Sequence, residues 1–150
     1  MKHITIEEAK IKATTYCYKS EKCIAEVREK LYAWGITNNR DSELIINFLL
    51  EENFINEERY ANAYVRDKFR FNKWGRKKIS MMLYSKQIDN VTIREALTEI
   101  DEEEYLSTLK ELLEAKATKI SATSEYEKQS KLFKFALSRG FESAIISRLI

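Results

Sequence analysis

The chain contains no proline and only three glycines, Gly35, Gly75 and Gly140, among its 150 residues. Proteins built from β-strands need many tight turns, and proline and glycine are the residues that turns use most. Glu, Lys, Leu, Ile and Ala dominate the sequence instead, as helices prefer. The sequence therefore predicts an all-α fold of long helices joined by short connections.

Capping residues indicate where these helices begin and end. The ranges Thr5–Glu8 and Ser124–Glu127 have the S/T-x-x-E spacing of a capping box, whose side chains accept backbone N–H groups at a helix start. Ser20 is expected to start a second helix, and Gly35 and Gly140 are expected to end helices in the left-handed conformation. Further starts are expected at Asn38, Asn56, Gly75, Asp89 or Asn90, Asp101 and Phe141. These positions predict nine helices.

An internal repeat relates the three thirds of the chain. The tripeptides Trp34–Ile36, Lys86–Ile88 and Arg139–Phe141 are spaced by 52 and 53 residues. Shifts of this size align Val27 with Ile79 and Leu132, Leu31 with Leu83 and Ala136, and Leu44 with Ala96 and Leu149. This period predicts three tandem three-helix, helix-turn-helix-like repeats over residues 1–53, 54–100 and 101–150. Because each repeat buries its apolar face on its neighbours, we expect an elongated, curved array.

The chain shows no pattern of secretion, membrane insertion or metal binding. Its first ten residues lack the apolar stretch of a secretory signal, and the longest apolar run, Leu44–Leu50, is too short to span a bilayer. Cys17 and Cys23 are expected to be half-buried, reduced thiols of a cytoplasmic protein. Because His3 is the only histidine, a zinc site would lack ligands. We therefore expect no metal and no other cofactor.

Patterns of catalytic residues are missing as well. No two glycines have the spacing of a phosphate-binding loop, so Gly75–Lys78 (GRKK) is not such a motif. The acidic clusters Glu51–Glu52, Glu57–Glu58 and Asp101–Glu104 lie at expected helix ends, where acids cap helices or face water. An enzyme is therefore the function class that the sequence supports least.

Charge is distributed unevenly along the chain. Residues 57–88 contain nine basic and three acidic residues, whereas residues 89–114 contain two basic and nine acidic residues. The most basic part, residues 65–79 (VRDKFRFNKWGRKKI), is named the basic segment here. Its candidate contact residues are Arg66, Lys68, Arg70, Lys73, Arg76, Lys77 and Lys78.

The placement of these cations suggests a negatively charged partner. Arg66 and Arg70 are four residues apart and share a helix face. Arg76, Lys77 and Lys78 open a helix, where the positive end of the helix dipole makes three cations unfavourable. An arrangement that costs helix stability indicates a ligand such as phosphate or acidic side chains.

Three interpretations of the basic segment remain open on composition alone: a solvated helix surface, a nucleic-acid contact and a docking surface for an acidic protein. The aromatic residues beside it do not decide between them. Tyr60, Tyr64, Phe69 and Trp74 have the spacing of core residues and are interpreted as core rather than as platforms for stacked bases.

Several motifs resemble those of the RecX family. The stretch Glu51–Ala61 (EENFINEERYA), followed by Lys73–Gly75 (KWG) and Leu83–Ile88 (LYSKQI), is similar to the central signature of that family. Ser20–Ile36 and Lys131–Phe141 resemble its first and closing units. The residues that match the motifs are Glu57, Glu58, Arg59, Tyr60, Ala61, Gly75, Leu83, Ile88, Arg139, Gly140 and Phe141. We interpret them as structural, with Tyr60 and Ala61 in packing and the two acids as first-turn caps.

The resemblance implies three tandem three-helix repeats and a regulator of the RecA recombinase. Members of the family bind the RecA filament on single-stranded DNA, limit its growth or stability, and so reduce ATP hydrolysis, strand exchange and co-protease activity. The resemblance further implies roles in DNA repair, homologous recombination and the SOS response, weak DNA binding, and no enzymatic activity. This chain departs from the family pattern at Asn56, Tyr60 and Gln87, where an acid, a phenylalanine and a glycine are common.

Two other functions compete with this one. A helix-turn-helix-like DNA-binding protein that acts without RecA would bind duplex tightly and usually as a dimer. A helical-repeat scaffold for another protein would affect neither DNA nor recombinase. No exposed apolar heptad indicates a dimer, so a monomer that does not contact membranes is expected.

Overall fold

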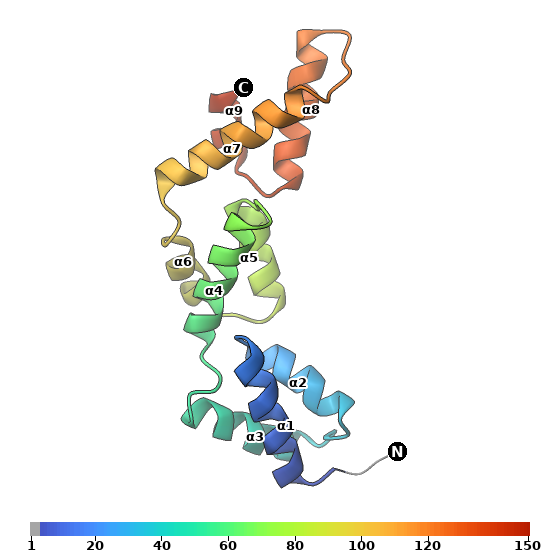
Figure 1. Cartoon of the computed structure of the whole chain (residues 1–150), viewed down its shortest axis with the longest axis vertical. Helices are drawn as coiled ribbons and strands as arrows, with labels where there is room; N and C mark the ends of the chain where they lie inside the picture. Colours follow the sequence, from blue (N-terminus) through green and yellow to red (C-terminus); the bar gives the residue numbers. More distant parts are fainter. Residues whose placement is uncertain (1–3) are drawn as a thin grey trace.

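The computed structural model describes residues 4–150, so His3 lies outside this range. Within it, the chain forms only helices and connecting segments, as predicted (Figure 1). The nine helices of this range are α1 (Ile6–Lys19), α2 (Ile24–Ala33), α3 (Asn39–Glu51), α4 (Glu57–Arg70), α5 (Arg76–Ser85), α6 (Asn90–Leu97), α7 (Glu102–Ala117), α8 (Glu125–Ser138) and α9 (Ser143–Leu149).

The helices pack in three successive groups. Helices α1–α3 contact one another, as do α4–α6 and α7–α9; these groups are called units one, two and three. In Figure 1 the units follow one another from bottom to top, and the lower and upper ends of the array both extend to the right of the middle unit. The predicted elongated, curved array is therefore confirmed. We propose residues 53/54 and 100/101 as the boundaries between the units.

Most helix starts follow the predicted caps. The Thr5 and Ser124 side chains accept hydrogen bonds from the backbone N–H of Glu8 and Glu127, both at 3.1 Å. Asn38, Asn56, Asp89 and Asp101 cap α3, α4, α6 and α7 with their side chains. The prediction for Ser20 is wrong, because this residue ends α1. Helix α2 starts after Cys23, whose N–H donates to Glu26 Oε1 at 3.1 Å.

Three equivalent positions of the repeat adopt the left-handed backbone conformation. Gly35, Gln87 and Gly140 follow α2, α5 and α8 with φ of 101°, 64° and 96°. Glycine reaches this region without strain, which is why the two glycines end their helices as predicted. Gln87 holds the same conformation with a side chain, at the position where the family pattern commonly has glycine.

Two apolar cores hold the array together. One is formed by unit one together with Ile55 of the connection that follows it, and contains Val27, Leu31 and Ile45; the other runs without interruption from α4 to α9. Of the repeat positions, the sets Val27, Ile79, Leu132 and Leu31, Leu83, Ala136 are buried, as the alignment predicts. In the third set Ala96 is buried, but Leu44 and Leu149 are 52% and 36% exposed. Leu44 faces outward because α3 turns Ile45, Ile46 and Leu49 inward.

The two cysteines are more buried than predicted. Cys17 is 8% exposed and Cys23 is completely buried, and the two thiols are not paired. Cys23 is the one residue of unit one that belongs to the buried core of units two and three, within residues 4–150. Its burial raises the pKa of the thiol to about 11, so the thiol stays protonated and unreactive at neutral pH.

None of the helices in the described part of the chain combines the length and the apolar character that crossing a bilayer requires.

Candidate partner-binding surface and unit junctions

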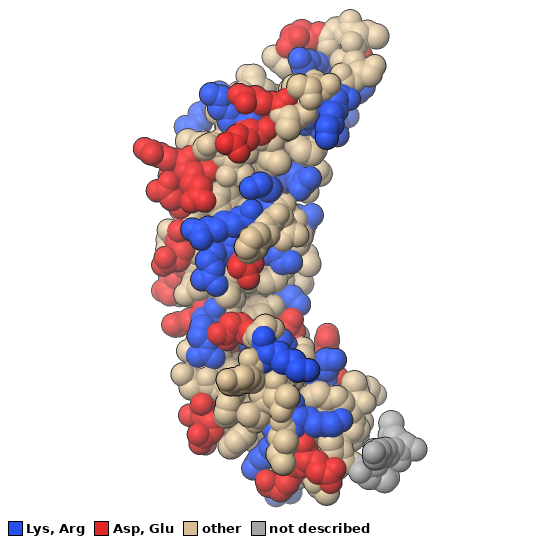
Figure 2. Space-filling view, viewed as in Figure 1, with Lys and Arg blue, Asp and Glu red and all other residues tan. Residues whose placement is uncertain are grey.

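The basic segment covers the second half of α4, the connection that follows it and the first turn of α5. Figure 2 shows basic side chains across the middle of the molecule over these elements, and an acidic cluster at the left edge near the start of α7. The uneven charge of the sequence therefore becomes two neighbouring surface regions of opposite sign.

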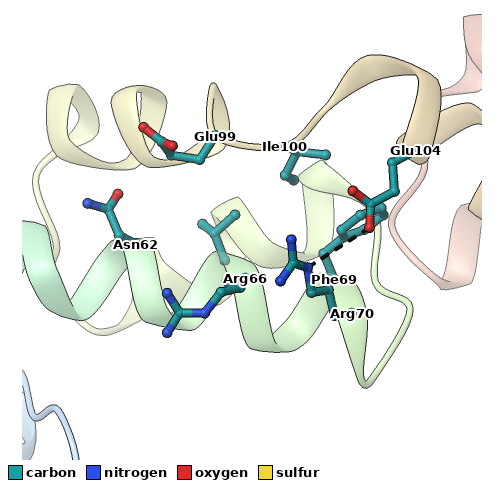
Figure 3. Close-up of a pocket in the computed structure, with 8 residues that line it drawn as sticks. Asn62, Arg66, Phe69, Arg70, Glu99, Ile100 and Glu104 are labelled. Atoms are coloured by element: carbon teal, nitrogen blue, oxygen red, sulfur yellow. Dashed lines mark ion pairs between the residues drawn. The ribbon is translucent and has the colours of Figure 1, made fainter.

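Arg66 and Arg70 lie on the same face of α4, as predicted, and line a hollow of about 360 Å³ (Figure 3). Glu99, Ile100 and Glu104 form its other wall. The Arg70 guanidinium points toward Glu104, with 3.9 Å between the nearest nitrogen and oxygen, and Arg66 lies 3.7 Å from its neighbour Asp67. Both arginines are more than half exposed, so these pairs are weak and leave the guanidinium groups accessible.

Lys68 and Lys78 lie against Trp74. Their ammonium nitrogens are 5.0 and 4.5 Å from the centre of one of its rings, and Lys68 is also 5.4 Å from the Tyr64 ring. These cation–π contacts hold both lysines in place without neutralising them. Trp74 and Tyr64 pack half-buried against the core, as predicted for aromatic residues of the segment.

Lys73 and Lys77 are exposed cations. Lys73 has a φ of 58°, and its ammonium group donates to the Arg70 carbonyl at 3.3 Å. The Lys77 backbone N–H is bonded to the Gly140 carbonyl at 2.9 Å, but its side chain forms no ion pair with any residue in 4–150. Both ammonium groups can therefore meet an anion from outside.

Arg76 differs from the other cations of the basic segment because it is ion-paired with two carboxylates of the same molecule. Its guanidinium pairs with Glu142 at 2.9 Å and with Glu102, and it stacks on the Tyr105 ring at 3.9 Å. Burial alone would lower the pKa of Arg76, but the hydrogen bonds to Glu142 and Glu102 raise it above its ordinary value. The negative partner that the sequence predicts for this cation comes from unit three. Arg76 is therefore assigned to the junction rather than to an external contact.

The junction between units two and three is built from motif residues. The N–H of Gly75 donates to the Arg139 carbonyl at 2.7 Å, and Arg139 Nη1 donates to the Asn72 carbonyl at 3.1 Å. The two chains approach so closely that a Cβ on Gly75 would overlap the Gly140 carbonyl. Phe141 is completely buried beside them. Glycine is needed at Gly75 for this approach, since its own φ of −80° suits any residue.

The first residue of α5 is capped by unit three. The N–H of Arg76 donates to the Tyr105 hydroxyl at 2.9 Å, and this hydroxyl in turn donates to Glu142. Burial raises the pKa of Tyr105, and the bond to Glu142 raises it further, so the phenol remains a donor. Sequence reasoning missed Tyr105 and Glu142. The sequence did contain one indication of such a contact. Gly75 has no side chain with which to cap α5, so another part of the chain has to supply the cap.

The junction between units one and two uses the central motif in the same way. Glu57 accepts the N–H of Ile24, the first residue of α2, at 3.3 Å. Arg59 Nε donates to Glu21 at 2.5 Å, and Lys86 pairs with Glu26 at 3.3 Å. Glu57 and Glu58 lie in the first turn of α4, as predicted, and Glu57 in addition caps a helix of the preceding unit. Its neighbour Glu58 is exposed, and Asn56 caps α4.

The remaining motif residues are core residues. Tyr60, Ala61, Leu83 and Ile88 are each at most 5% exposed. Burial raises the pKa of Tyr60, whose ring also packs on Tyr64 with 5.9 Å between centroids. The motif residues therefore form the core and the junctions of the units. The accessible cations are other residues, which lie between the motif residues in the sequence.

Comparison with known proteins identifies the family. Residues 56–97 match the family model described as RecX, second three-helix domain, and residues 102–150 match RecX, third three-helix domain. The regulatory protein RecX of Clostridium perfringens (strain 13 / Type A) is 32% identical, over 97% of this chain and 69% of that protein. The regulatory protein RecX of Clostridium botulinum (strain Alaska E43 / Type E3) is 34% identical, over 98% and 68%.

Solved structures agree with this result. The crystal structure of RecX from Lactobacillus salivarius superposes with a TM-score of 0.85 at 28% identity, covering 96% of this chain and 93% of that one. It resembles this chain in fold along nearly its whole length. Family models, relatives and fold agree that the chain belongs to the RecX family of regulatory proteins.

Proposed function

We propose that this chain binds the RecA filament on single-stranded DNA and inhibits ATP hydrolysis, strand exchange and co-protease activity by limiting filament growth or stability. The chain would thereby regulate DNA repair, homologous recombination and the SOS response as a cytoplasmic monomer that is not an enzyme. The observation that carries this proposal is the match to regulatory proteins named RecX over nearly the whole chain.

The electrostatics support a filament as the partner. A filament of protein on DNA offers carboxylates and phosphates along its axis. The array presents cations on an elongated surface that can lie along such a filament. The proposed contact residues are the accessible cations of the basic segment: Arg66, Lys68, Arg70, Lys73, Lys77 and Lys78. Arg76 is left out because Glu102 and Glu142 already occupy its guanidinium.

The test is ATP hydrolysis by the cognate recombinase on single-stranded DNA, titrated with this protein. We expect inhibition well below one molecule per recombinase protomer, because one bound molecule affects many protomers of a filament. A variant with Lys73, Lys77 and Lys78 changed to Gln should reach the same inhibition of ATP hydrolysis only at a higher protein concentration than wild type. If the lysines meet phosphates, the logarithm of the binding constant should depend less steeply on the logarithm of the salt concentration. The slope should fall by about 0.7–0.9 for each lost contact. Absence of inhibition by folded wild-type protein in several-fold excess would reject the proposed function.

The accessible cations also favour a second function, DNA binding without RecA. Three-helix units can place one helix in a groove of duplex DNA. Tight binding of the wild-type protein to duplex DNA in the absence of recombinase, together with no effect on ATP hydrolysis, would favour this second function over the first.

A further inference from the structure

One face of α5 exposes two large apolar side chains to solvent. Met81 and Tyr84 are 64% and 66% exposed, although both lie in the middle unit of the array. Together with Lys77 and Ser80 they have the i, i+3, i+4, i+7 spacing of one helix face. Two large apolar side chains side by side on a surface helix commonly mark a binding surface.

This face forms one wall of a groove. Asn90 and Leu97 of α6 line the opposite wall, and the groove has a volume of about 560 Å³. Arg76 and Glu142 lie at its edge. The groove therefore joins units two and three, and it is called the α5–α6 groove.

The charges of the groove specify what would fit it. Arg76 and Glu142 are paired with each other at 2.9 Å, so they neutralise one another. Lys77 is the only remaining charged residue among those that line the groove. The complement is an apolar segment that carries one carboxylate. Nucleic acid matches this groove poorly, because Met81 and Leu97 offer no donors and Lys77 is the one unpaired cation of the described lining that could meet a row of phosphates.

A second copy of this chain matches it poorly as well. In a two-fold contact the same face would meet itself, and its lining offers no free carboxylate to a facing Lys77. A different protein that supplies the carboxylate is favoured by charge complementarity.

We propose that the α5–α6 groove seats a short apolar segment of a recombinase protomer, with one carboxylate of that segment against Lys77. This proposal rests on the proposed function and adds a specific protein contact to it. Met81 and Tyr84 provide the buried apolar anchors of such an interface, and Lys77 fixes the orientation of the segment.

The experiment measures binding to recombinase filaments on labelled single-stranded DNA, held with a non-hydrolysable ATP analogue. Met81→Asp and Tyr84→Glu each place a charge where the apolar segment would lie. We expect either variant to bind about tenfold more weakly or worse, as for the loss of an anchor residue. The control is Tyr126→Glu, the same change at a tyrosine that is 84% exposed on α8, and it should bind like wild type. Thermal unfolding verifies that all variants are folded.

The outcomes separate this proposal from the proposed function. If wild-type protein does not bind the filament, the proposed function fails and the groove loses its partner. If wild type binds and the Met81 and Tyr84 variants bind equally well, only the groove proposal fails. Equal weakening of binding to protein-free single-stranded DNA would assign the groove to nucleic acid instead. Loss of wild-type self-association in the variants, measured by light scattering, would assign it to a second copy.

Discussion

Three successive cations, Arg76, Lys77 and Lys78, begin α5, and they differ in what surrounds them. Arg76 is held by two carboxylates, Lys78 lies on Trp74, and Lys77 has no ion pair within the described residues. The sequence predicts the charge of all three and the cost of placing them at a helix start. The sequence does not predict which of the three is ion-paired, because Glu102 and Glu142 lie 26 and 66 residues after Arg76 along the chain.

This difference predicts that the same substitution destabilises the protein at Arg76 and hardly affects it at Lys77. Arg76→Gln leaves Glu142 and Tyr105 without their cation in a partly buried site, and should reduce the free energy of unfolding by about 1–3 kcal/mol. Lys77→Gln should change it by less than about 0.5 kcal/mol, since it removes an exposed charge. Urea unfolding of the two variants measures both values. Equal stability of the two variants would contradict the assignment of Arg76 to the junction.

The helices differ in where their caps come from. Helices α3, α4, α6, α7 and α8 are capped by the side chain that precedes them, and their starts could be predicted from the sequence. Helix α2 receives a cap from the next unit through Glu57 in addition to its own Glu26, and α5 is capped by the next unit through Tyr105. These contacts join residues 33 and 29 positions apart, so local capping rules cannot find them. The start at Ser20 is misplaced for another reason: α2 follows Cys23, which is not a usual capping residue and whose N–H is bonded locally to Glu26.

The borrowed cap on α2 predicts a pH dependence. Burial raises the pKa of Glu57 above its ordinary value of 4.5, although the bond from Ile24 lowers it, so ionising Glu57 costs more in the folded than in the unfolded protein. Wild-type stability relative to Glu57→Gln should therefore fall as pH rises from 4.5 through the raised pKa. Glu57→Ala removes the acceptor and should cost about 1 kcal/mol. The measurement is urea unfolding across this pH range.

Glu58→Gln is the matched control for this series, because Glu58 is the adjacent acid and is exposed. It should behave like wild type at each pH. A pH dependence that is identical in Glu57→Gln and wild type would show that Glu57 does not titrate in a buried junction.

At the scale of the whole molecule, the period of 52 to 53 residues predicts the three-unit array, but not its unequal junctions. Units two and three share one continuous apolar core and a backbone contact at Gly75 and Gly140. Unit one has its own core and meets unit two through ion pairs, the Glu57 cap and the buried Cys23. Repeat spacing reports similarity between units and carries no information about how strongly neighbours are joined.

Because unit one has its own core, we expect unit one to unfold locally before units two and three. Amides of Ile45 and Leu49 in α3 should exchange with solvent through a partial opening, with a lower free energy than those of Ile79 and Leu83 in α5. Hydrogen exchange under native conditions measures both sets of amides. Equal protection of the two sets at the free energy of global unfolding would mean that the three units unfold as one.

Caps that are borrowed from the following unit also order events during synthesis on the ribosome. The start of α2 stays incomplete until Glu57 emerges, 33 residues after Ile24, which takes about 2–7 s at ordinary elongation rates. Arg76 waits 66 residues for Glu142, or about 3–13 s. The nascent chain therefore completes the first and second units only when the unit that follows each of them appears. The middle unit, with its accessible cations, is finished only after Glu142 of unit three has been made.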